Sequence, residues 1–143
     1  MNSEVVYLVK DKLMVKTIKQ TAVFKGVTPY AVYETLMDSK KHAAFSGEKA
    51  NISREIGGTS SASDGWIEAI NIELLADKKI VQAWRGGDWP KGHYSIATFT
   101  LSASGKDTKL SFTQISVPDN KAEDIADGWK EYYWEKMKRV LEK

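Results

Sequence analysis

The clearest helical pattern in the chain is NKAEDIADGWKEYYWEKMKRVLEK, residues 120–143. Its apolar side chains fall on one broad face when residues are placed at 100° steps: Ala122, Ile125, Ala126, Trp129, Tyr133, Met137 and Val140. Asn120 with Glu123 three residues later is typical of a capping box and predicts the start of the helix. A face this apolar has to pack against another element of the protein.

Four apolar segments before this helix have the pattern of strands. They span residues 67–75, 80–85, 94–101 and 110–117, and they are separated by short polar breaks. Short polar connections indicate hairpins, and therefore an antiparallel meander. The Gly- and Ser-rich stretch at 57–65 has turn composition, with Asp64-Gly65 as a hairpin signal. We expect the long helix to lie on the concave side of this sheet.

The first part of the chain predicts one strand and two short helices. Residues 17–24 alternate as a strand does. Thr28 is placed as an N-cap with Pro29 at the first helical position, and a short second helix is expected around residues 43–45. Strands bracketed by helices at both ends predict the α+β class rather than a parallel doubly wound sheet. The sequence leaves open whether the first dozen residues form an extra strand or an extension.

Length and composition favour one ordinary domain and exclude several kinds of site. The chain has 143 residues, 21 Lys and Arg against 19 Asp and Glu, and no cysteine. A charge of +2 gives no long-range attraction for nucleic acid, so that partner is not expected. The lack of cysteine excludes disulfide, iron-sulfur and cysteine-zinc sites. No apolar run reaches the ~20 residues of a membrane span, and no signal-like start occurs, which favours the cytoplasm.

The chain carries no motif of a known catalytic or cofactor site. It lacks a phosphate-binding glycine loop, a Gly-x-Ser-x-Gly elbow and a His-Glu-x-x-His helix. Its two histidines, His42 and His93, have no evident nucleophile near them in sequence, and two histidines make a metal cage unlikely. We therefore expect no cofactor, no metal and no enzyme activity.

Aromatic residues are concentrated in three segments. There are five Trp, six Tyr and four Phe. The segments are KIVQAWR at 79–85 followed by WPKGHY at 89–94, TKLSFTQ at 108–114, and GWKEYYW at 128–134. Large rings cover much area per residue, which suits a domain that wraps a cavity or presents a binding face, and equally suits an aromatic core.

In this order the segments resemble the activator-of-heat-shock-protein-90-ATPase homologue family, within the START-like, birch-pollen-allergen-like helix-grip superfamily. The resemblance covers about residues 15–141. It implies a curved antiparallel sheet, two short helices after the first strand, and a long C-terminal helix packed across the sheet. We expect a single START-like domain over 1–143, with 1–14 as an extension or extra strand and 15–142 as the core. The family-type positions that carry over by motif are Trp84, Arg85, Trp89, His93, Trp129 and Tyr133.

Two functions follow as hypotheses from this resemblance, while a third, a cyclase or hydrolase activity of the kind that occurs on helix-grip folds, is not expected. The first is a non-catalytic domain that binds a heat-shock protein 90 chaperone and stimulates its ATPase, with Trp89 and His93 on an exposed rim. The second is a carrier or sensor of a small hydrophobic molecule held between sheet and helix, with Arg85 or His93 as polar anchor. The cavity of such a carrier is expected to be lined also by Trp66, Phe99, Phe112 and Met137. Two alternatives stay open: Trp89 folds back over the cavity mouth, or the rings simply fill the core.

Overall fold

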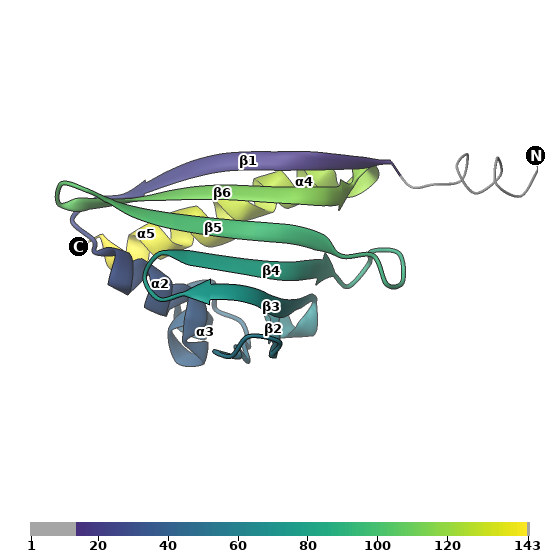
Figure 1. The fold of residues 1–143 in the computed structure, drawn as a ribbon, viewed down its shortest axis with the longest axis horizontal. Coiled ribbons are helices and arrows are strands. Elements are labelled where there is room, and N and C mark those ends of the chain that lie inside the picture. The colour runs from purple at the N-terminus through teal and green to yellow at the C-terminus, as the bar shows by residue number, and fades with distance from the viewer. Residues whose placement is uncertain (1–13, 143) are drawn as a thin grey trace, which may run out of the picture.

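The computed structural model describes residues 14–142, whose helices all lie on one side of a six-stranded antiparallel sheet (Figure 1). The strands follow the order β1-β6-β5-β4-β3-β2. Their bounds are β1 (Val15–Phe24), β2 (Thr59–Ala62), β3 (Ile67–Leu75), β4 (Lys79–Gly86), β5 (Ser95–Ser104) and β6 (Asp107–Pro118). The expected extension or extra strand lies, except for its last residue, outside the described residues. The predicted α+β helix-grip fold is confirmed.

The two short helices after β1 begin where local capping dictates. In α2 (Pro29–Met37), the Thr28 hydroxyl accepts a hydrogen bond from the Ala31 amide, and Pro29 occupies the first turn. In α3 (Ser39–Ser46), the Asp38 carboxylate accepts from the Lys41 amide. Together the two helices place His42 and Phe45 against the C-terminal helix.

The segment predicted as a turn at 57–65 contains the edge strand β2, so that prediction is wrong for residues 59–62. Ser60 of β2 is buried, and its hydroxyl accepts a hydrogen bond from the Ser53 amide. Pairing with β3 satisfies the backbone of this Ser-rich segment, which overrides its local turn preference. The hairpin at Asp64-Gly65 is confirmed, and both residues have positive φ, at 56° and 93°.

The C-terminal helix lies across the concave side of the sheet, and its middle is π-helical (Figure 1). It comprises α4 (Ala122–Gly128), the π-helical segment Trp129–Trp134 and α5 (Glu135–Leu141). The predicted capping box is wrong, because a 3₁₀ turn (Asp119–Lys121) precedes the helix and no side chain caps α4. Within the described residues, no helix is both long and apolar enough to cross a bilayer.

The π-helical turn changes which residues face the sheet. In an α-helix Trp134 would lie roughly 140° around the axis from Trp129. The wider turn brings the two indoles into a stack, with centroids 5.5 Å apart and planes at 17°. Trp134 is therefore buried, whereas Val140, placed on the apolar face by a regular 100° step, is 42% exposed. The face predicted from the sequence is wrong at these two positions.

Candidate functional site: an aromatic cluster beside an open groove

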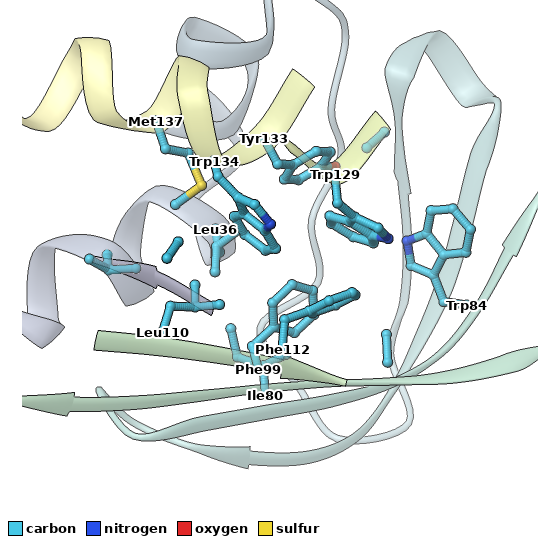
Figure 2. Packing of buried hydrophobic residues seen from close by; sticks show 14 of the residues in the cluster. Leu36, Ile80, Trp84, Phe99, Leu110, Phe112, Trp129, Tyr133, Trp134 and Met137 are labelled. Atoms are coloured by element: carbon cyan, nitrogen blue, oxygen red, sulfur yellow. The ribbon is translucent and has the colours of Figure 1, made fainter. Parts of the chain in front are cut away.

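The core between sheet and C-terminal helix is a cluster of stacked rings. Trp129 lies at its centre, within 4.5 Å of the Phe112 ring centroid and 5.5 Å of that of Trp84 (Figure 2). We call the following residues the aromatic cluster: Trp84, Trp89, Phe99, Phe112, Trp129, Tyr133 and Trp134. All are buried, with 7% exposure or less. Such a cluster holds the helix rigidly against the sheet.

Two glutamines on the concave side of the sheet fix the indoles of the helix. The Trp129 indole N–H donates to Gln114 Oε1 at 2.8 Å, and that of Trp134 donates to Gln20 Oε1 at 2.7 Å. Gln114 in turn donates to the Ser95 hydroxyl at 2.9 Å. Sequence reasoning assigned these glutamines no role. The available signal was a polar residue at an inward position of an alternating strand.

A buried histidine–tyrosine pair joins α3 to the C-terminal helix. His42 Nδ1 lies 3.0 Å from the Leu36 carbonyl oxygen, and Nε2 lies 2.9 Å from the Tyr133 hydroxyl. A carbonyl only accepts, so Nδ1 carries the proton of a neutral ring and Nε2 accepts from Tyr133. Burial lowers the pKa of His42, although the Leu36 hydrogen bond opposes this, and burial raises the pKa of Tyr133.

Because the folded protein holds His42 neutral, stability should fall as the pH drops below about 6.5, the usual histidine pKa. In that range the unfolded chain binds a proton at His42, whereas the folded chain does not. Through His42 the free energy of unfolding should fall by at most about 1.4 kcal/mol for each pH unit. This fall should end once the pH reaches the lowered pKa that His42 has in the folded protein. Urea unfolding of the native protein and of His42→Gln between pH 7.5 and 4.5 isolates the effect. Parallel profiles for the two proteins would contradict it, and His93→Gln serves as the matched control.

The loop after β4 is folded inward, so the expectation of an exposed Trp89 is wrong. Trp89 is 4% exposed and packs on Trp84 and His93. Its indole N–H is buried without a partner in the described structure, which costs about 1–3 kcal/mol. Burying a tryptophan removes about 150–250 Å² from water, a gain of about 4–6 kcal/mol that outweighs this cost. The sequence left open whether Trp89 lies on an exposed rim or folds back, and the structure shows it folded back.

The two expected polar anchors brace this loop instead of facing a cavity. Arg85 follows Trp84 in β4 and therefore points to the opposite face of the sheet. Its Nη2 donates to the Trp89 carbonyl at 3.0 Å, and its guanidinium lies 5.9 Å from the Tyr94 ring centroid. His93 Nε2 lies 2.8 Å from the Ser116 carbonyl oxygen. As cavity anchors, both residues were predicted wrongly.

Two hollows lie beside the aromatic cluster. An inner pocket of ≈ 30 Å³ is lined by Phe99 and by the His42–Tyr133 pair, among others. A larger open groove of ≈ 420 Å³ runs between the C-terminal helix and residues 46–48 and 63–67. Trp66, Trp84, Trp129 and Tyr133 line this groove. Phe112 and Met137, expected to line a cavity, line neither hollow and are 1% and 0% exposed.

The sequence that forms this sheet, loop and helix matches the model of a known protein family. The model of the family described as Activator of Hsp90 ATPase homolog 1-like protein matches residues 26–142, from the turn before α2 to the residue after α5. The chain belongs to this family.

Members of the Hsp90 ATPase activator homolog family are among the curated relatives of the chain. The activator of 90 kDa heat shock protein ATPase homolog of Dictyostelium discoideum is 32% identical over 127 residues, which covers 88% of this chain and 33% of that protein. Homolog 1 of Homo sapiens is 28% identical over 125 residues, which covers 87% of this chain and 36% of that protein. The chain thus spans about a third of the length of these relatives.

Solved structures share the fold of this family member. A crystal structure of an HSP90 activator from Plasmodium falciparum matches with a TM-score of 0.82 at 23% identity, covering 87% of this chain and 94% of that chain. The solution structure of an Aha1 dimer from Colwellia psychrerythraea gives a TM-score of 0.74 at 16% identity, covering 89% and 96%. At these identities the likeness shows the fold alone.

Proposed function

We propose that the chain binds a chaperone of the Hsp90 type and stimulates its ATPase, acting as a binding domain without catalysis of its own. The observation that carries this is the family match over residues 26–142, together with curated relatives that are named as activators of that ATPase. A cytoplasmic location is part of the proposal, and the absence of cysteine is compatible with a reducing compartment.

The engagement of His42 at both ring nitrogens, and of His93 at one, supports a binding role. Both ring nitrogens of His42 lie within hydrogen-bond distance of protein groups, and Nε2 of His93 bonds a backbone carbonyl. A general base needs a ring nitrogen free to reach a substrate proton. Here these nitrogens hold elements of the fold together instead.

The filled core argues against the alternative role as a carrier of a small hydrophobic molecule. Pockets for drug-sized ligands measure roughly 300–1,000 Å³ and bury most of the ligand's surface. The groove of ≈ 420 Å³ has such a volume but is open to solvent, so it would not enclose a hydrophobic molecule. The inner pocket of ≈ 30 Å³ has room for about one water molecule. The aromatic cluster occupies the space that such a ligand would need (Figure 2).

The proposal predicts a change in the ATPase rate of the Hsp90 from the same organism. Adding the native protein should raise that rate in a saturable way, and a specific Hsp90 inhibitor should abolish the increase. The rate is measured with a coupled phosphate-release assay, with heat-unfolded protein as the control. An unchanged rate, with no binding detected by calorimetry, would refute the proposed function.

A further inference from the structure

The open groove beside the aromatic cluster has the shape of a docking site on the outside of the fold. Its ≈ 420 Å³ lie between the C-terminal helix and residues 46–48 and 63–67. We call it the helix groove and define it by Glu48, Trp66, Trp84, Asp124, Gly128 and Tyr132. The volume accommodates a few side chains of an extended peptide segment.

Exposed rings form part of the lining of the helix groove. Trp66 is 40% exposed and Tyr132 is 54% exposed, and both line the same hollow. Trp84 and Trp129 also line the groove, although both are buried. Exposed tryptophan and tyrosine next to a hollow are the residues that dominate binding energy at interfaces.

The charges at the groove favour a cation. Three carboxylates line it, those of Glu48, Asp88 and Asp124, against the amines of Lys121 and Lys136. Lys121 Nζ is paired with Asp88 at 2.9 Å. Within residues 14–142, Glu48 and Asp124 take part in no ion pair.

One ring of the groove already holds an ammonium group. Lys136 Nζ lies 5.4 Å from the Tyr132 ring centroid and donates to the Ser46 carbonyl at 3.2 Å. An aromatic face beside carboxylates binds ammonium and guanidinium groups through cation–π and ionic attraction together. Within residues 14–142 no cation lies over the ring of Trp66, so Trp66 is the exposed ring of the groove that a partner's cation can use.

A glycine in the helix keeps the groove open. Gly128 has helical angles, φ −61° and ψ −41°, so its backbone does not require glycine. A Cβ built on it would meet only Tyr132 Cδ2 at 3.7 Å, an ordinary contact. Alanine would therefore fit and would stabilise the helix. A larger side chain at this position would instead occupy space in the groove.

We propose that the helix groove is where the Hsp90 partner docks a basic segment, inserting a lysine or arginine side chain beside the ring of Trp66 and toward Glu48 and Asp124. This inference rests on the proposed function and names the surface that performs it. The occupant is a basic protein segment, because the groove lining carries two carboxylates, Glu48 and Asp124, that no ion pair within residues 14–142 neutralises.

Substitutions at Gly128 separate blockage of the groove from damage to the fold. Gly128→Ala should raise the melting temperature by about 2–5 °C. It should leave the dissociation constant for Hsp90 within about twofold, since one methyl group occupies little of the groove. Gly128→Leu should weaken binding by about tenfold or more, because its larger side chain fills the space while the protein stays folded. Binding is measured by calorimetry with full-length Hsp90, and folding by circular dichroism.

A matched pair of acidic residues tests the charge argument. Asp124→Asn should weaken Hsp90 binding by about two- to fivefold and reduce its dependence on salt, because one attracting carboxylate is lost. Asp127→Asn, three residues later and outside the groove lining, should leave both unchanged. Trp66→Ala should weaken Hsp90 binding by about two- to fivefold, because the cation–π contact is lost.

The outcomes distinguish this inference from the proposed function. If Hsp90 binds the native protein and Gly128→Leu equally well, the groove is not the docking site and the inference is overturned while the function stands. If Hsp90 does not bind the native protein, both fall. If Gly128→Leu instead changes the sedimentation of the protein alone, the groove is an interface between copies, which also overturns the inference.

Discussion

Trp129→Ala should lower the free energy of unfolding by about 3–5 kcal/mol, the largest effect expected for a single substitution in this protein. Trp129 is 3% exposed and touches rings from β4, β5 and β6 as well as its own helix. Removing it leaves a cavity at the centre of the aromatic cluster that the close-packed neighbours cannot fill. Urea unfolding followed by far-ultraviolet circular dichroism measures the loss.

Two further variants keep this measurement interpretable. Tyr132→Ala removes a 54% exposed ring from the same helix and should change stability by less than about 0.5 kcal/mol. Trp129→Phe keeps a ring in place and should stay folded if the alanine variant does not. A loss below about 1 kcal/mol for Trp129→Ala would mean that the cluster does not support the fold as described.

Gln114→Leu should lower the free energy of unfolding by about 1–3 kcal/mol although it makes the core more apolar. Leucine cannot accept a hydrogen bond from the Trp129 indole N–H, which would then be buried without a partner. Gln114 is 0% exposed, so water cannot replace it without opening the core. Thr113→Val, on the outer face of the same strand, is the matched control and should change stability by less than about 0.5 kcal/mol.

A double-mutant cycle tests whether the hydrogen bond is the cause. Combining Gln114→Leu with Trp129→Phe removes donor and acceptor together and leaves no orphaned N–H. The double variant should therefore lose less stability than the sum of the two single variants. Additive losses would assign the effect of Gln114→Leu to packing rather than to the hydrogen bond.

The elements of the fold that the sequence predicted are those set by neighbouring residues. The alternation at residues 17–24 and the polar breaks between the later segments predicted β1 and the meander. Thr28 and Pro29 predicted the start of α2, because a cap acts within three residues. The motif resemblance predicted the family, and the match over residues 26–142 confirms it.

The candidate site was only partly predictable. The aromatic segments indicated which residues gather, and Trp84, Trp129 and Tyr133 lie together beside the groove. The burial of Trp89 was left open by the sequence, since a loop tryptophan flanked by glycine and proline can point either way. The opposite directions of Trp84 and Arg85 could have been predicted from strand alternation alone.

The sequence by itself determined the fold class, the strands other than β2 and the start of α2, because these depend on periodicity and caps that act over a few residues. Its motifs, by resemblance, indicated the family. Only the tertiary structure decided the π-helical turn at Trp129–Trp134, the strand β2 and the inward fold of Trp89. Each of these departs from a local preference because contacts between residues far apart in the chain outweigh it. Two indoles bonded to glutamines of β1 and β6 are compatible with a widened helical turn, and no pattern within residues 120–143 contains those partners.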